Sequence, residues 1–458
     1  MKPYKLILFF FLVIFHYGIA AQVISVHTFQ KDDSLLKKTF YDESLRKKKL
    51  LIASAEKKLA ADYKKIYDEQ FDAITDIWKG SRPITSADAH SYLQAVVKKI
   101  TAANPEISGT DARVVFSRDW WPNAFSMGDG TIVINAGLLI YLNNEAELAF
   151  IVGHELAHYY LEHTPQAIKK YVETINSEAY QSELKRLSKT EYRVNQQLEQ
   201  MAKAIAFNSH GHRRDRESEA DRYAFMFMKK AGFDCNAIRS CLNLLDKVDD
   251  SVFHQSPKLE TVFSFDDYFF KKRWVQKESS IFSELKEDNS PLSEKEKDSL
   301  KTHPDCSKRI AMLEDSMLAS GNTGKQFAVD EKAFSKLKKE FILEMTEQCF
   351  REKKLSRNLY YSLMLLQTEE HKAYAVYSIA RCLNEIYVSQ RDHKLGLMVD
   401  VESKGYREEY NLLLRMLSKL RLEEIANLNY YFCSRYRSFM NGDRGFEEEG
   451  RKAQRFKN

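Results

Sequence analysis

The chain is short of the two residues that end helices and build tight turns. Its 458 residues include 16 glycines and 8 prolines, against usual shares of roughly 7% and 5%. No proline follows Pro304. Because a protein of many short strands needs such residues at its turns, this scarcity disfavours that class and predicts long helices. We expect a mostly α chain with a small β-sheet, an α+β fold.

Two short runs have the composition of strands. Residues 112–116 and 130–135 are rich in β-branched side chains, and turn residues lie between them at 120–123 and 127–130. This pattern predicts a small sheet. Helical patterns on both sides of it cover residues 33–80, 87–104, 145–162, 166–207, 215–230, 355–367 and 370–390.

The first 20 residues have the pattern of a secretory signal. Lys2 and Lys5 precede a short apolar run at 6–15, and small residues follow at 18–21. The run is short for a membrane span, and an uncleaved anchor is the alternative to a cleaved signal; no later stretch reaches 18 apolar residues. We therefore expect an exported, soluble mature chain without a membrane span, periplasmic or, where the cell has no outer membrane, secreted.

Charge and cysteine usage exclude two further classes. The net charge of +5 comes from interleaved acidic and basic residues, so no one-sided basic face for nucleic acid is expected. The six cysteines show no C-x-x-C pairing and form neither a disulfide framework nor a zinc ribbon.

One short motif carries chemistry. His154-Glu155-Leu156-Ala157-His158 is an H-E-x-x-H sequence inside a predicted helix. Residues four apart lie one above the other on a helix, so His154 and His158 can bind one metal ion. Glu155 lies about 100° further round, where it can reach a metal-bound water but is poorly placed as a ligand. The motif indicates a zinc site with Glu155 as general base.

A catalytic zinc needs a third protein ligand. The metzincin class would place a histidine six residues after His158, but Thr164 stands there. His163 lies five residues after His158 and would face away from it on a continuous helix. His210 and His212 lie in a break between predicted helices. These three histidines remain weaker candidates.

Glu217 is the other candidate, at the start of the next predicted helix. It would complete a His, His, Glu ligand set. Asp221, one turn later on the same face, could accept the free ring N–H of a ligand histidine, whereas Glu219 faces the opposite side. The alternative is that Glu217 and Asp221 only complement the dipole at a helix N-terminus.

Together these motifs resemble the HtpX and CAAX-prenyl-protease family of gluzincin metallopeptidases. The resemblance covers about residues 85–315 and rests on segments 123–125, 130–137, 144–148, 154–158, 217–221, 302–304 and 309–310. It implies zinc ligation by His154, His158 and Glu217. It also implies that Glu155 is the catalytic base and that Asp221 orients a ligand.

The resemblance implies further roles. His303, in the pair His303-Pro304, would stabilise the oxyanion or, as in periplasmic relatives, occupy the open position of zinc and keep the enzyme latent. Arg309 would anchor that turn. Strand 131–135 would be the edge strand to which an extended substrate peptide is added.

HtpX and the prenyl protease span the membrane several times, whereas only an exported leader is expected here. The chain therefore resembles the soluble periplasmic, BepA-like branch of the family, which has a C-terminal helical domain, more than it resembles these membrane proteins. The implied parts are a signal peptide at 1–20, a helical segment at 21–84, a zinc metallopeptidase domain at 85–318 and an α-helical, repeat-like domain at 325–458.

We expect an endopeptidase with one Zn²⁺ per chain that hydrolyses misfolded or misassembled envelope proteins. The alternative is a chaperone-like assembly factor with latent protease activity, whose C-terminal helices bind an envelope protein. A structural zinc protein is disfavoured because it gives Glu155 no reason to stand between the two histidines.

Overall fold

The computed structural model describes residues 31–187, 214–251, 258–277, 306–321, 323–403 and 406–457. In these residues the fold is α+β, with helices around one four-stranded sheet. The expected signal peptide, His210, His212 and His303 lie outside the described residues. Among the described helices, none has the length and apolar character needed to cross a membrane. All six cysteines are described, and each is a buried free thiol.

The sheet has the order β1-β2-β4-β3. Its strands are β1 (Pro83–Ile84), β2 (Arg113–Ser117), β3 (Ala124–Ser126) and β4 (Thr131–Asn135). β2 and β4 run parallel, and β1 and β3 pair antiparallel with them. Every residue of β2 and β4 is buried, because helices cover both faces of the sheet.

The prediction that residues 131–135 form the edge strand is wrong. β4 lies between β2 and β3, and the described edge on that side is β3. Residues 127–130 form the turn that brings β3 back against β4, with Gly128 and Gly130 at φ of 79° and 95°. β3 has only three residues, too few to show the alternation by which strands are recognised in a sequence.

The helices on the two sheet faces come from different parts of the chain. An antiparallel pair, α1 (Ser34–Ala53) and α2 (Ala60–Lys79), covers the face that carries Val115 and Val133. The opposite face, with Phe116 and Ile134, belongs to the main core. Over this face lie α3 (Ala87–Ala102), α5 (Glu145–Tyr160) and α14 (Glu331–Arg351).

The α5 helix begins where its sequence predicts. Asn144 is the N-cap, and its side chain accepts a hydrogen bond of 3.0 Å from the Glu147 backbone amide. The remaining elements of this part of the chain are η1 (Pro105–Ile107), α4 (Ala136–Leu139), α6 (His163–Ile175), α7 (Glu178–Leu187), the helix over residues 214–230, α9 (Ala237–Ser251) and α13 (Cys306–Ser320). Of these, α6 packs against α2 through Val172.

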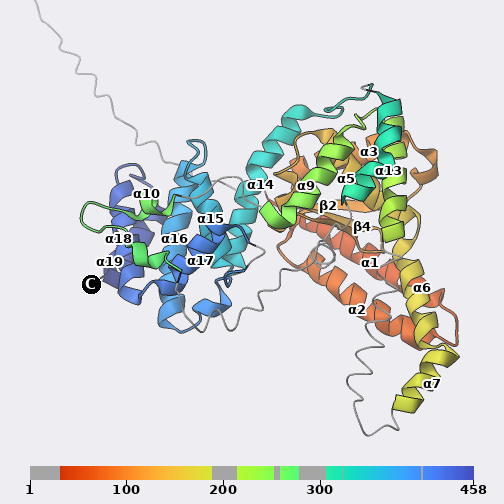
Figure 1. The fold of residues 1–458 in the computed structure, drawn as a ribbon, viewed down its shortest axis with the longest axis horizontal. Helices are drawn as coiled ribbons and strands as arrows, with labels where there is room; N and C mark the ends of the chain where they lie inside the picture. The colour runs from red at the N-terminus through yellow and green to blue at the C-terminus, as the bar shows by residue number, and fades with distance from the viewer. Residues whose placement is uncertain are drawn as a thin grey trace, which may run out of the picture.

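A second group of helices forms a lobe at the C-terminal end of the chain (Figure 1). It consists of α15 (Leu355–Leu365), α16 (Lys372–Arg391), η3 (Leu395–Leu397), α17 (Glu408–Lys419), α18 (Leu422–Tyr436) and α19 (Arg444–Lys457). Helix α14 lies between the two groups and contacts both, α3 and α4 on one side and α15 on the other.

The chain also crosses between the two groups before α14. Residues 258–277, named here the crossing segment, contain α10 (Leu259–Phe263) and η2 (Lys272–Trp274). They fall within the range expected for the peptidase domain, yet α10 contacts α18 and η2 contacts α17. Phe263 and Trp274 are fully buried. The chain then returns to α13, which packs against α9.

Candidate metal centre

Three side chains from two helices converge on one point. His154 and His158 of α5 place their Nε2 atoms 3.0 Å apart. The Glu217 carboxylate, on the helix over 214–230, lies 3.5 Å from His154 Nε2 and 3.7 Å from His158 Nε2. Ligand atoms around a tetrahedral zinc with bonds of about 2.0–2.2 Å are about 3.3–3.6 Å apart. Among the described residues this is the one group of three side chains with such geometry.

A buried ion pair supports this cluster. Asp221 is fully buried, and its Oδ1 lies 2.8 Å from His154 Nδ1. Arg309 of α13 donates to both Asp221 oxygens, at 2.6 and 2.7 Å, and its Nη1 lies 3.4 Å from Glu217. Arg309 therefore neutralises both carboxylates rather than only anchoring a turn. Because 88 residues separate it from Asp221, no local pattern in the sequence could predict this contact.

The electrostatics of the cluster favour a bound cation. Burial disfavours a charge on His154, but Asp221 and Glu217 outweigh burial and raise its pKa to about 10. Burial and the charge on His154 lower the pKa of His158 to about 3. One positive charge is thus held between the two rings and Glu217. A metal ion could take the place of that proton, so both the donor set and the charge fit a divalent metal.

Glu155 lies beside both the cluster and the edge strand. Its side chain is buried, and burial raises its pKa to about 7, against the opposing charge of His154. The carboxylate accepts a hydrogen bond from the Ser126 backbone on β3. A carboxylate with a pKa near neutrality, next to a strand edge, is suited to proton transfer on a peptide bound at that edge.

The prediction that His163 faces away from His158 is wrong. Helix α5 ends at Tyr160, and Glu162 has left-handed backbone geometry with φ 54° and ψ 35°. This turn redirects the chain, so that His163 Nδ1 lies 2.8 Å from His158 Nδ1. His163 contacts the far side of the His158 ring and does not belong to the three-residue cluster. Its other nitrogen lies 3.3 Å from the Glu219 carboxylate, a half-exposed side chain outside the three-residue cluster.

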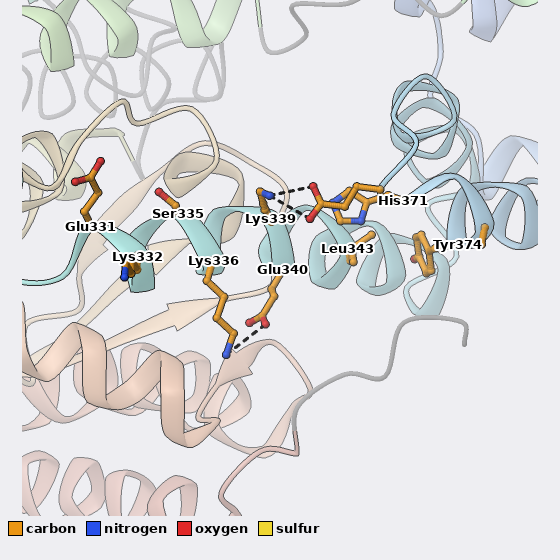
Figure 2. A pocket seen from close by; sticks show the side chains of 11 residues that line it. Glu331, Lys332, Ser335, Lys336, Lys339, Glu340, Leu343, His371 and Tyr374 are labelled. Carbon is orange, nitrogen blue, oxygen red and sulfur yellow. Dashed lines mark hydrogen bonds and ion pairs between the residues drawn. The ribbon is translucent and has the colours of Figure 1, made fainter. Parts of the chain in front are cut away.

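A surface hollow lies away from the metal cluster, between α14 and the start of α16 (Figure 2). Its volume is about 900 Å³, and none of the metal-cluster residues lines it. Two ion pairs join its lining residues, Lys339 with Glu370 at 3.0 Å and Lys336 with Glu340 at 3.8 Å. The hollow is thus formed mainly by α14, the helix between the two groups, and is separate from the metal centre.

Fold and site together define a metallopeptidase of the H-E-x-x-H class. The model of peptidase family M48 matches residues 87–317, about half of the chain, and the chain belongs to this family. Helix α5, strands β2 to β4 and the helix over residues 214–230 lie within the matched range, which ends inside α13. Membership of a peptidase family agrees with the H-E-x-x-H sequence and with the His, His, Glu cluster of the site.

Three relatives share parts of this range. A protein named beta-barrel assembly-enhancing protease, from Vibrio cholerae, is 26% identical over 39% of this chain and 37% of its own length. Metalloprotease YcaL of Escherichia coli is 26% identical over 38% of this chain and 67% of its own length. Mitochondrial metalloendopeptidase OMA1 of Arabidopsis thaliana is 33% identical over 16% of this chain and 15% of its own length. The chain thus spans less than half the length of the Vibrio protein.

Proposed function

We propose that the chain is a zinc-dependent endopeptidase of the cell envelope, with His154, His158 and Glu217 as zinc ligands. The observation that carries the proposal is the convergence of these three side chains on one point, with Glu155 one residue after the first ligand. Two nitrogens and one carboxylate oxygen are the ligand set of many catalytic zinc sites. Export from the cytoplasm follows from the leader pattern at 1–20.

The chain's own residues supply the proton transfers. A bound zinc would polarise the scissile carbonyl and make water more acidic. Glu155 takes a proton from the attacking water and delivers it to the leaving amine, tasks suited to a carboxyl group with a pKa of about 7. Asp221 accepts the Nδ1–H of His154 and holds the ring in place. No covalent acyl-enzyme is needed.

The substrate would bind to β3 as an additional strand. Within the described part of the chain, β3 is at the end of the sheet and pairs only with β4. Its residue Ser126 is the backbone partner of Glu155. An extended peptide added at this edge would have its backbone close to the base, so misfolded proteins with exposed extended segments are the proposed substrates.

Replacement of Glu155 by Gln tests the proposal. Glu155→Gln should bind zinc at one ion per chain but cleave casein 10² to 10⁴ times more slowly, the usual range for loss of a general base. Glu173→Gln, at a surface ion pair of α6, is the matched control and should cleave at the wild-type rate. Zinc content and casein hydrolysis, with and without chelator, are the measurements. Wild-type cleavage by zinc-loaded Glu155→Gln would contradict the mechanism.

The second candidate function is an envelope assembly factor that keeps its protease latent. The observation in its favour is the C-terminal lobe, together with the hollow on α14 that lies away from the metal centre. In this proposal an envelope protein binds the lobe and His303 restrains the zinc site. His303→Ala should then raise casein hydrolysis, and Glu155→Gln should still complement a deletion strain. Failure of Glu155→Gln to complement would favour proteolysis as the main task.

A further inference from the structure

On the side away from the metal cluster, the His158 ring contacts the ring of His163. His163 is buried, 4% exposed, and its Nδ1 lies 2.8 Å from His158 Nδ1. Its Nε2 lies 3.3 Å from Glu219 Oε2. The three groups form a chain from a surface carboxylate, through one imidazole, to a proposed zinc ligand. None of the roles assigned above to the metal site uses His163 or Glu219.

Proton positions along this chain follow from hydrogen-bond chemistry. An ionised Glu219 carboxylate can only accept, so the neutral His163 ring carries its proton on Nε2. The Nδ1 of His163 is then a lone pair, and it accepts the proton on His158 Nδ1. The Nε2 of His158 is consequently left with a lone pair, and this is the atom that lies 3.0 Å from His154 Nε2 inside the cluster.

We propose that His163 and Glu219 are positioning residues that hold His158 in the Nδ1–H form, with its Nε2 lone pair directed at the metal. The inference rests on the proposed function, since it takes His158 to be a zinc ligand. The two histidines would then be supported in different ways. His154 donates directly to the Asp221 carboxylate, whereas His158 reaches a carboxylate through a second imidazole.

The backbone geometry explains how His163 reaches this position. Glu162, in the left-handed region, separates α5 from α6, and His163 is the first residue of α6. The Glu162 carbonyl then accepts from the Gln166 amide at 2.9 Å, as expected for a helix that starts anew. A left-handed conformation is unfavourable for a residue other than glycine, so packing around the turn must hold Glu162 in this geometry.

The test compares two replacements of His163 by zinc affinity, measured by competition with a chromophoric chelator on the full chain. His163→Leu removes the acceptor, and we expect zinc affinity to fall 10- to 100-fold, the usual effect of losing a partner of a ligand histidine. In His163→Asn, Oδ1 takes approximately the place of Nδ1 and can accept from His158. This variant should recover most of the affinity.

Glu219→Ala tests the outer end of the chain. Glu219 is half exposed, so its loss should leave the fold intact even where His163→Leu does not fold. We expect a smaller fall in zinc affinity than for His163→Leu. Asp215→Ala removes an exposed carboxylate from the same helix and is the matched control, with wild-type affinity expected.

Nitrogen-15 NMR of histidine in the zinc-free protein reports the tautomer directly. His158 should carry its proton on Nδ1 in the wild type and in His163→Asn, and should shift toward the Nε2–H form in His163→Leu. Equal zinc affinities of wild type and His163→Leu would overturn the inference, as would a His163→Asn variant as weak as His163→Leu. Loss of zinc binding is expected for His154→Ala, and a wild-type chain that binds no zinc would refute the proposed function itself.

Discussion

At the scale of single residues, the charge balance of the metal centre depends on Arg309. It is 2% exposed and is the cation that faces Asp221 and Glu217. These carboxylates in turn stabilise positive charge on His154. The cluster residues on α5 and on the helix over residues 214–230 could be predicted, because H-E-x-x-H spacing and an acidic pair one turn apart are local patterns. The partnership with Arg309 depends on tertiary packing of α13, which sequence spacing does not encode.

Replacement of Arg309 by Met should therefore destabilise the protein. Met fills a similar volume but leaves only His154 to balance two buried carboxylates, and breaking a buried ion pair costs about 3–5 kcal/mol. Urea unfolding measures the free energy of unfolding. Lys308→Met, at the exposed neighbouring position, should change this free energy by less than about 0.5 kcal/mol. Equal stability of Arg309→Met and wild type would show that Arg309 does not balance these charges.

At the scale of elements, local signals located the helices and failed at the sheet edge. Helices α3 and α5 begin at Ala87 and Glu145, where helices were expected to begin. The strands expected at 112–116 and 130–135 are found at 113–117 and 131–135. β3 was missed because three residues carry no periodicity. The direction of His163 was missed because α5 ends at Tyr160, two residues before its predicted end.

Helix α5 is also hydrogen-bonded to the segment just before α14, the helix that lies between the two groups of helices. Glu145, the first residue of α5, accepts hydrogen bonds of 2.7 Å from the backbone amides of Ala328, Val329 and Asp330, just before α14. Glu145→Gln replaces one acceptor oxygen by a donor, so at least one of these part-buried amides loses its partner. We expect a loss of about 1–3 kcal/mol in the free energy of unfolding by urea. Glu331→Gln, exposed at the start of α14, should have no measurable effect.

At the scale of the whole molecule, helix α14 packs against both the sheet and the C-terminal lobe. Phe341 of α14 packs on Phe116 of the sheet, with ring centroids 5.0 Å apart. Further along α14, Glu347 pairs with Arg381 of α16 at 2.6 Å. Removing residues from 325 onward would therefore strip one face of the sheet. Such a truncation would not yield a smaller intact peptidase, and point substitutions are the sounder way to separate the roles of the two groups.

A substitution in the crossing segment can show whether the two groups of helices unfold together. Trp274 is fully buried and belongs to η2, which packs on α17 of the C-terminal lobe. Trp274→Ala should cost about 3–5 kcal/mol, a fall of about 3–5 °C in melting temperature for a chain of this size. Phe269→Ala, at a 71% exposed position of the same segment, should leave that temperature unchanged. If the two groups unfold together, thermal inactivation of casein hydrolysis in Trp274→Ala will fall by the same amount as the unfolding midpoint measured by circular dichroism. An early unfolding step with peptidase activity retained would show instead that the lobe unfolds on its own.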